Sequence, residues 1–247
     1  MYHRAILVVL LSSWLVRAEE SAEFRMPAGF RIREYAGDDL AHDIYSMTLD
    51  AKGRVVVSGR GYVKTLRDDD GDGRADRATL FVAAPAKGAR GMYFDGPDLI
   101  CAGDGALARF RDQDEDGVAD GPREVLAETD QRGGDHSANG VIRGPDGWFH
   151  VACGNDAGVA ERQITGPGSP VARPRQGVVF RCATDGRQAD VMAHGFRNPY
   201  DLAFAEDGTL LMVDADGERD QYLPWYSPSR LFDVASGMLH GWMLKGW

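Results

Sequence analysis

The chain has 247 residues, and 38 Asp and Glu against 28 Lys and Arg give it a formal net charge of −10 at pH 7. This acidity argues against a nucleic-acid partner, because binding to phosphates needs a basic surface. The three cysteines (Cys101, Cys153 and Cys182) form neither a CxxC nor a CxxCH motif, which argues against metal or haem ligation. Cys101 and Cys153 end strand-like runs and are expected to be buried thiols, while one disulfide among the three is left open.

The N-terminus has the features of a secretory signal peptide. Residues 1–18, MYHRAILVVLLSSWLVRA, combine a basic start, an apolar core over 5–16 and a small residue at Ala18. The apolar run is short for a membrane span, and an uncleaved anchor is the alternative. Cleavage would remove Arg4 and Arg17, so the net charge would become −12 (−10 minus 2). We therefore expect a periplasmic or extracellular protein without a stable span after signal removal, with a linker at 19–27 and one domain at 28–247.

A repeat fills that domain. After FRIREYAG (30–37), which alternates like a single strand, the segments 46–59, 91–103, 140–154 and 201–214 each read as strand, tight turn, strand. Their turn aspartates, Asp50, Asp95, Asp146 and Asp207, are 45, 51 and 61 residues apart (95 minus 50, 146 minus 95, 207 minus 146). Two further strands complete each unit, except that the outermost strand of the fourth is unclear, and no helix is expected. This period predicts an all-β fold, a β-propeller of four-stranded antiparallel blades with about four blades present.

The propeller model sorts the loops into two ends. With strands counted from the axis outward, the connections between blades and the loops between second and third strands share one end, the site end. The first-to-second and third-to-fourth hairpins share the other, the hairpin end. Asp135, His136, Arg197 and Asn198 fall in inter-blade connections, while Asn155 and the acidic run 214–220 fall in second-to-third loops. All of them are therefore expected at the site end, which the long loop 156–176 is expected to cover.

Two acidic hairpins, DDDGDGRAD at 68–76 and DQDEDGVAD at 112–120, repeat 44 residues apart (112 minus 68). Hard oxygens at loop positions one, three, five and nine, with a glycine at six, are typical of calcium loops. The glutamate expected at position twelve of an EF-hand is replaced by Thr79 and Arg123. The prediction is two structural calcium hairpins at the hairpin end, and the alternative is solvated acidic turns. The predicted ligands are Asp68, Asp70, Asp72 and Asp76, and Asp112, Asp114, Asp116 and Asp120.

Four motifs carry a family resemblance. They are GARGMYFDG with Arg90, GGDHSANGVIRGPDGWFHVACGN, HGFRNPYDLAF and LPWYSPSRLFDVASGMLHGW. Together they resemble the soluble quinoprotein glucose dehydrogenase and sorbosone dehydrogenase family, closest to the exported "membrane-bound dehydrogenase" propellers of planctomycete-type bacteria. The resemblance covers about 28–242. Because that family closes a six-bladed ring, it implies that about two blades are absent and that the chain is a fragment.

The resemblance implies an exported oxidoreductase that oxidises a sugar or other polyol with pyrroloquinoline quinone, passing electrons to an unidentified acceptor for which a cytochrome is a candidate. His136 would be the general base, oriented by Asp135. Arg197 would stabilise charge on the quinone, Asn198 would hydrogen-bond it, and Asn155 and Arg90 are further candidate contacts. A calcium ion near Asp214 and Asp216 would polarise the quinone.

Two other classes of function stay open. One is a non-catalytic propeller that binds carbohydrate or protein through its loops, in which His136 is an ordinary surface histidine. The other is a calcium-dependent lactonase of the gluconolactonase type, for which Asn155, Asp214 and Asp216 could serve as ligands. The chain also carries Tyr200-Asp201 where the sugar dehydrogenases usually have Gln-Gly, which leaves the cofactor's identity open. Convergence of His136 and Arg197 at one place would favour the dehydrogenase.

Overall fold

The computed structural model describes residues 24–130, 135–215 and 228–242, and divides the chain into the units Met1–Glu34 and Tyr35–Trp247. The predicted signal peptide lies outside the described residues. The strand expected at 30–37 is wrong, because these residues carry no strand, and residues 30–34 are exposed. An alternating sequence forms a strand only where a neighbouring strand accepts its hydrogen bonds, and none of the described strands pairs with it. No helix in the described part of the chain is long and apolar enough to cross a membrane.

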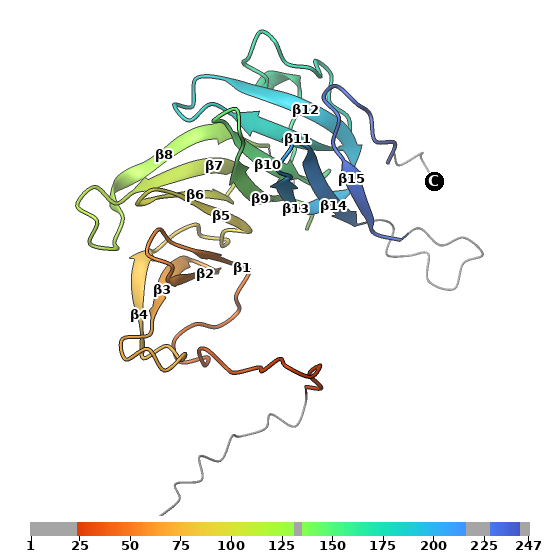
Figure 1. The fold of residues 1–247 in the computed structure, drawn as a ribbon. Helices are drawn as coiled ribbons and strands as arrows, with labels where there is room; N and C mark the ends of the chain where they lie inside the picture. Colours follow the sequence, from red (N-terminus) through yellow and green to blue (C-terminus); the bar gives the residue numbers. More distant parts are fainter. Residues whose placement is uncertain (1–23, 131–134, 216–227, 243–247) are drawn as a thin grey trace, which may run out of the picture. The chain divides into compact units, whose positions relative to one another are not determined.

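All the strands of the described residues belong to the second unit and form four antiparallel sheets, the blades of a β-propeller (Figure 1). Each blade runs in sequence order, so the predicted all-β architecture is confirmed. The fourth blade contributes three strands among the described residues, and the helical structure described is one short 3-10 turn, η1 (Glu161–Gln163). The blades are β1 (Ser46–Leu49), β2 (Val55–Gly59), β3 (Tyr62–Arg67) and β4 (Arg77–Val82); β5 (Gly91–Asp95), β6 (Asp98–Gly103), β7 (Ala106–Arg111) and β8 (Asp120–Glu128); β9 (Ala138–Arg143), β10 (Phe149–Cys153), β11 (Gly177–Cys182) and β12 (Ala189–Phe196); and β13 (Asn198–Phe204), β14 (Leu210–Ala215) and β15 (Arg230–Asp233).

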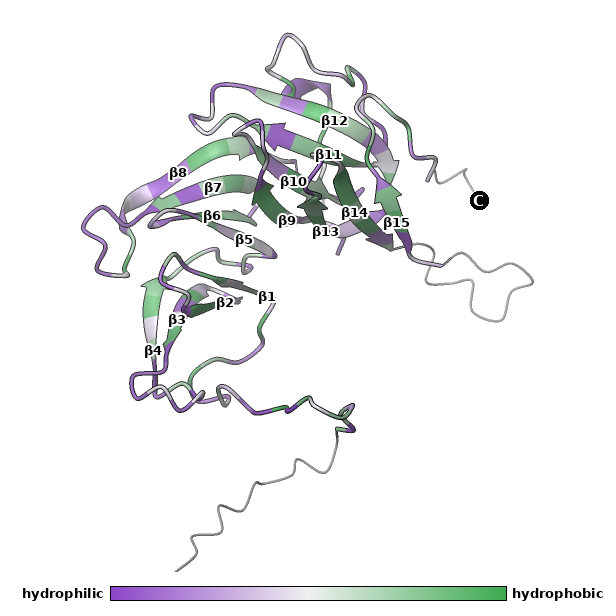
Figure 2. Cartoon of the chain, in the orientation of Figure 1, coloured by the Kyte–Doolittle hydropathy of each residue, from purple (hydrophilic) through white to green (hydrophobic). Residues whose placement is uncertain are grey.

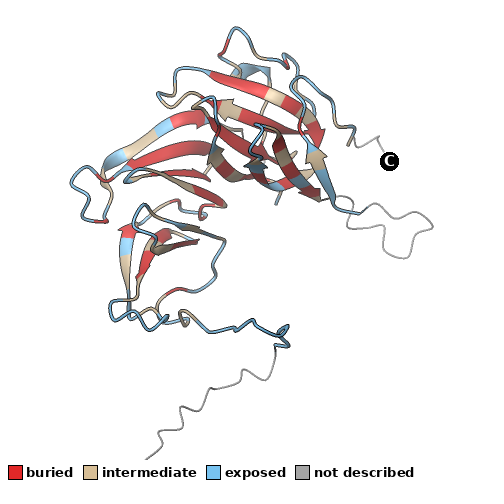
Figure 3. Cartoon of the chain, in the orientation of Figure 1, coloured by how far each residue is buried: buried red, intermediate tan, exposed pale blue. Residues whose placement is uncertain are grey.

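The apolar side chains of the second and third strands lie between the blades. Both strands are buried on two faces, so they read as nearly continuous apolar runs, such as GVVFRC in β11 (Figures 2 and 3). Three interface clusters follow in turn, centred for example on Leu99, Phe149 and Phe196. All three cysteines are free and buried within these clusters, and burial raises the pKa of each thiol to about 12. The cysteines are therefore packing residues.

The innermost strands approach one another closely, and glycines permit this. A β-carbon at Gly91 of β5 would lie 2.0 Å from the backbone oxygen of Asn139 in β9. A β-carbon at Gly140 of β9 would lie 2.6 Å from the Asp201 carboxylate in β13. Side chains at these two positions would push the blades apart. The close contact brings the site-end connections of neighbouring blades within hydrogen-bonding distance.

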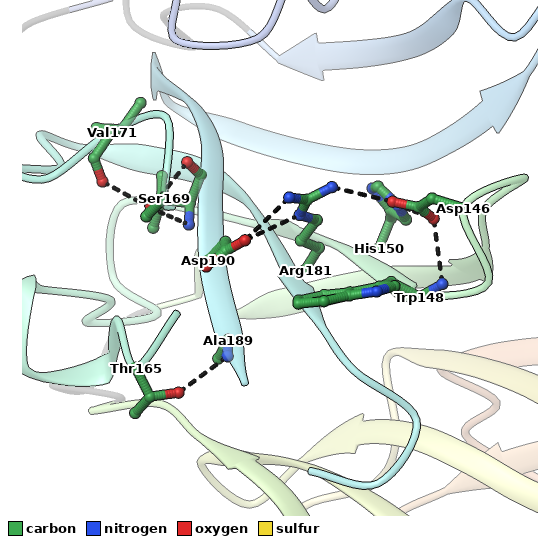
Figure 4. A network of polar contacts seen from close by, with 10 residues as sticks. Asp146, Trp148, His150, Thr165, Ser169, Val171, Arg181, Ala189 and Asp190 are labelled. Carbon is green, nitrogen blue, oxygen red and sulfur yellow. Dashed lines mark hydrogen bonds and ion pairs between the residues drawn. The ribbon is translucent and has the colours of Figure 1, made fainter. Parts of the chain in front are cut away.

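The long loop 156–176 was expected to cover the site end, but its middle part packs along a sheet edge instead. Its middle part follows the outermost strand of the third blade, where Thr165 N–H donates to the Ala189 carbonyl (2.9 Å) and Val171 N–H to the Val191 carbonyl (3.2 Å). The Ser169 hydroxyl accepts from Val191 N–H at 3.0 Å (Figure 4). The free edge of β12 offers unpaired backbone groups, and the loop satisfies them. It therefore protects a sheet edge.

At the hairpin end of the third blade, Arg181 joins two aspartates. Its guanidinium donates to Asp146 (Nη1 to Oδ2, 3.0 Å) and Asp190 (Nη2 to Oδ2, 2.9 Å), and lies 4.7 Å from the centre of the Trp148 ring (Figure 4). His150 Nε2 lies 3.1 Å from Asp146 Oδ1. Burial lowers the pKa of His150, against the opposing effect of Asp146. Burial also acts to raise the pKa of Asp146, but hydrogen bonds from His150 and Trp148 N–H outweigh it and leave that pKa lowered.

Candidate functional site

His136 lies in the connection between β8 and β9, with its ring beside the second-to-third loop of its own blade. Its Nδ1 is 2.6 Å from Asn155 Oδ1 and 3.8 Å from Asp156 Oδ2. The Asn155 amide nitrogen donates to Asp156 Oδ1 (3.3 Å), which turns the amide oxygen toward the imidazole. An amide oxygen only accepts hydrogen bonds, so this network assigns the proton of the neutral ring to Nδ1. Nε2 then carries the lone pair, as a general base requires.

The backbone around His136 is held from two sides. Asp156 N–H donates to the His136 carbonyl (3.1 Å), and Gly154 N–H donates to the Ser137 carbonyl (2.9 Å). A β-carbon at Gly154 would lie 2.5 Å from the His136 carbonyl oxygen, so only glycine fits without displacing the loop. His136 is therefore fixed by its own blade, although 19 residues separate it from Asn155.

Arg197 and Asn198 stand where the third blade passes into the fourth. Their consecutive backbone N–H groups donate to the two carboxylate oxygens of Asp214, Arg197 to Oδ2 (2.9 Å) and Asn198 to Oδ1 (2.7 Å). The Arg197 carbonyl accepts from Asn155 N–H at 2.8 Å. Asn155 thus touches the His136 ring with its side chain and the Arg197 backbone with its N–H. The structure brings His136, Asn155, Arg197 and Asn198 together at the site end.

Asn139 is a residue that the sequence analysis missed. It is 2% exposed, and its side-chain nitrogen donates to Asn198 Oδ1 (3.1 Å) and to the Pro199 carbonyl (2.8 Å). The Asn139-Gly140 pair reads as a turn, but it lies inside β9, where the pairing with β10 shifts register. The only signal in the sequence was an Asn-Gly pair inside an apolar strand. Because Asn198 Oδ1 accepts this bond, the Asn198 amide N–H groups face other partners.

Asp135 and Arg90 lie at the margin of this group. Asp135 is exposed, and its backbone carbonyl accepts from Arg90 Nη1 at 3.3 Å. Among the described residues, Asn155 and Asp156 contact the His136 ring, and Asp156 was not among the predicted site residues. Arg90 comes from the connection between the first and second blades, so three successive connections contribute to the site end.

The sequence predicted Asp214 in a loop, but it lies in β14 and is 5% exposed. Both of its oxygens accept backbone N–H groups, so its position is explained by Arg197 and Asn198 without a metal ion. β14 continues beyond its apolar residues because Asp214 still pairs with Pro199 of β13. Asp216, the other predicted ligand, lies outside the described residues.

The acidic hairpins lie at the hairpin end, between β3 and β4 and between β7 and β8. In each, three carboxylates place an oxygen within 4.8 Å of the others: Asp68, Asp70 and Asp76 in one, and Asp112, Asp114 and Asp116 in the other. The other two predicted ligands fall outside these triads. Asp72 accepts Arg74 N–H (2.8 Å), and Asp120 accepts Gln113 N–H (2.7 Å).

The two hairpins share one hydrogen-bond pattern. The first aspartate of each accepts the N–H of the glycine at position six at 3.0 Å, Gly73 to Asp68 and Gly117 to Asp112. These glycines have φ angles of 87° and 92°, which other residues rarely adopt. Burial raises the pKa of Asp112, and the neighbouring Asp116 and Asp114 add to the rise while backbone N–H groups oppose it. Each carboxylate triad suits a divalent cation that hard oxygen ligands bind.

These features define a β-propeller that carries a histidine, an arginine and asparagines at one end, in its inter-blade connections and beside them. A family model described as a domain of unknown function, DUF7133, matches residues 17–225, and the chain belongs to this family. No curated protein matches the chain.

Solved propellers share the fold. An oxidoreductase (glucose dehydrogenase) from Thermus thermophilus has a TM-score of 0.62 at 21% identity, over 87% of this chain and 68% of that one. The quinone-bound aldose sugar dehydrogenase of Streptomyces coelicolor gives 0.58 at 15% identity, over 81% and 62%. The calcium-binding protein regucalcin from Agrobacterium tumefaciens gives 0.51 at 16%, over 81% and 65%. The fold is thus that of the glucose dehydrogenase-like propellers, and this chain spans roughly two thirds of their length.

Proposed function

We propose that this chain is an exported oxidoreductase that oxidises a sugar or other polyol with pyrroloquinoline quinone, and that His136 is its general base. The observation that carries the proposal is the position of Asn155, which fixes the His136 ring with its side chain and holds the Arg197 backbone with its N–H. A base and a cation at one end of the axis suit removal of a proton from an alcohol while an acceptor gains negative charge.

His136 performs the proton step. Nε2 accepts the proton of the substrate hydroxyl, and the resulting imidazolium keeps Nδ1–H directed at Asn155 Oδ1. Asp156, 3.8 Å from Nδ1, stabilises the positive charge that develops on the ring. The side chain of His136 is 18% exposed, so it is reachable from the site end while its orientation is fixed. Asp135 is proposed to orient His136 through the backbone that joins the two residues, because Arg90 donates a hydrogen bond to the Asp135 carbonyl.

The residues at the site end fit a flat quinone that carries three carboxylates. Arg197 and Arg90 are cations, and guanidinium groups bind carboxylates well. Asn198 retains amide N–H groups for a quinone or carboxylate oxygen because its own oxygen is bound by Asn139. When bound, the quinone supplies the two-electron acceptor for the hydride that leaves the substrate carbon. The aldose sugar dehydrogenase among the structural neighbours is quinone-bound, which supports this choice.

Calcium is proposed as a structural ion in the two acidic hairpins. Their carboxylate triads converge, and they lie at the end opposite His136, so an ion there would stabilise the blades rather than take part in the reaction. A catalytic calcium near Asp214 and Asp216 remains a prediction that rests on Asp216, because the Asp214 oxygens already bind backbone N–H groups.

A calcium-dependent lactonase would need several carboxylates around one point at the site end. Among the described residues, the convergent triads lie in the hairpins. The site-end carboxylates of Asp156 and Asp214 belong to no such triad and accept hydrogen bonds from Asn155 and from backbone N–H groups. This arrangement favours the oxidoreductase. The proposed location, the periplasm or the exterior of the cell, rests on residues 1–18, and the electron acceptor is proposed to be a separate redox protein such as a cytochrome.

The test is reconstitution. The purified protein is incubated with pyrroloquinoline quinone and calcium, passed through a size-exclusion column, and assayed with aldoses and an artificial dye acceptor. We expect quinone absorbance to co-elute with the protein and dye reduction to depend on both quinone and sugar. Elution of protein free of quinone at concentrations well above micromolar would contradict the proposal. Quinone binding without turnover of any sugar or polyol would retain the cofactor and reject the substrate class.

A further inference from the structure

Tyr200 occupies an unusual place in the innermost strand of the fourth blade. The pairing of β13 with β14 joins Pro199 to Asp214 and Asp201 to Val213, so Tyr200 is the extra residue of a β-bulge. Bulges turn a side chain away from the direction that regular alternation would give it. Tyr200 is 56% exposed, although its strand lies against β9 and its backbone oxygen would be 2.9 Å from a β-carbon at Gly140.

The bulge directs Tyr200 toward the first blade. Its hydroxyl donates to the Tyr45 carbonyl at 3.3 Å, a contact between residues 155 positions apart. Tyr45 directly precedes β1, and its N–H donates to the Ser58 carbonyl, so it lies at the site end of the first blade. The innermost strands β1, β5, β9 and β13 are neighbours in this order (Figure 1). The Tyr200 side chain therefore connects the last of these strands to the first across the space they surround.

Arg197 and Asn198 lie three and two residues before Tyr200 in the chain. A strand advances about 3.3 Å per residue, so Tyr200 is a few steps further from the site end than the residues proposed to bind the cofactor. Its hydroxyl donates to the Tyr45 carbonyl, and its backbone packs closely against Gly140 of β9. The phenol ring thus extends from β13, two residues beyond Asn198, to the start of the first blade, and Tyr200 remains 56% exposed.

We propose that Tyr200 forms the floor of the axial site and contacts the flat face of the ligand bound there. A held aromatic ring offers an apolar face for stacking, and few of its rotamers remain to be lost on binding. The ligand class that fits is a planar, anionic ring system of the quinone type, held at its edge by Arg197 and Asn198. This inference rests on the proposed function and adds to it the surface on which the cofactor lies.

The test uses equilibrium binding of pyrroloquinoline quinone to the full chain, measured by quenching of protein fluorescence and by dialysis. The variants are Tyr200→Ala, which removes the ring, and Tyr200→Phe, which keeps the ring and loses the hydrogen bond to Tyr45. Leu231→Ala is the matched control, because Leu231 is 67% exposed in the same blade on β15. Tyr200→Ala should raise the quinone Kd about tenfold, while Tyr200→Phe and Leu231→Ala should stay within about threefold of the unmodified chain.

Several outcomes would reject the proposal that Tyr200 forms the floor of the axial site. Equal quinone affinity of Tyr200→Ala and the unmodified chain would reject it, as would equal loss in Tyr200→Ala and Tyr200→Phe, which would assign the effect to the Tyr45 hydrogen bond. A chain that binds no quinone would reject both the floor and the proposed cofactor. Quinone binding that depends on the Tyr200 ring in a chain without sugar oxidation would confirm the floor and reject only the proposed reaction.

Discussion

The two ends of the propeller differ in where their functional groups come from. At the hairpin end, each carboxylate triad is contributed by one stretch of nine residues between two paired strands, such as 68–76. At the site end, contacts join different connections: Asn155 binds Arg197, and Asn139 binds Asn198 across a blade boundary. A local site can form with its hairpin, whereas the site end exists only when neighbouring blades are docked. The reaction chemistry is therefore proposed for the end that depends on the whole sheet arrangement.

The sharpest test of this difference is His136→Ala. Removing the proposed base should lower kcat by a factor of about 100 to 10,000, since general base catalysis typically contributes that much. Quinone binding should change little, because the proposed cofactor contacts are Arg197 and Asn198. Steady-state dye reduction and quinone titration measure the two effects. His42→Ala is the matched control, since His42 is exposed and lies outside the site. Turnover of His136→Ala at the rate of this control would end the assignment of the base.

Arg197→Ala should act on the same end in the opposite way, by weakening cofactor binding. A charged hydrogen bond contributes about 1.5–3 kcal/mol, so the quinone Kd should rise by roughly 10- to 150-fold. Once quinone is saturating, a smaller loss in kcat is expected. Arg187→Ala offers a matched control, because Arg187 lies in an exposed turn at the hairpin end. If Arg197→Ala binds quinone as tightly as Arg187→Ala, then Arg197 serves the contact between blades and not the cofactor.

Calcium should raise the stability of the folded chain without affecting the proposed general base, His136. Three carboxylates within 4.8 Å repel one another, and a bound cation removes this repulsion. At a hundredfold excess over its Kd, calcium stabilises by about 2.7 kcal/mol per site, which is roughly 5–10 °C in melting temperature for a chain of this size. Thermal unfolding with calcium and with a chelator measures the shift. Asp68→Asn combined with Asp112→Asn should abolish it, whereas Asp185→Asn, in an exposed turn of the third blade, should retain it. A melting temperature that is the same with calcium and with the chelator would identify both hairpins as solvated turns.

The same difference explains what the sequence could predict. The blade strands, their turns and the acidic hairpins follow from local patterns, because apolar alternation and Asp-Gly turns specify each hairpin within a few residues. The sequence also selected His136, Arg197 and Asn198 as site residues, and the topology placed them at one end. It could not identify Asp156 or Asn139 as their partners, because those contacts depend on register shifts and on the distance between blades. The isolated strand expected at 30–37 failed for a related reason, since no described strand pairs with it.

The smallest expected effect is on the pH dependence of stability, and it concerns the third blade, which differs from the first two. Its hairpin end has no acidic triad among the described residues and depends instead on Arg181, Asp146, Asp190 and His150. The folded state lowers the pKa of His150 through burial, so the unfolded chain binds more protons as the pH falls below about 6.5. The stability contributed by neutral His150 is therefore present above that pH and is lost on acidification. The lowered pKa of Asp146 acts in the same direction at lower pH, below its ordinary value of 3.8.

The prediction is a melting temperature that falls between pH 7.5 and 5.5 with the chelator present throughout, so that calcium does not contribute. Asp146 and Arg181 are the charged groups that act on His150, and the Phe204 ring of the fourth blade packs against it at 5.0 Å. His150→Gln keeps a side-chain amide that can donate to Asp146 but does not titrate, so its melting temperature should depend less on pH. His42→Gln, which removes an exposed histidine, should keep the full dependence. An identical pH profile for His150→Gln and His42→Gln would show that the acid sensitivity of the propeller arises elsewhere.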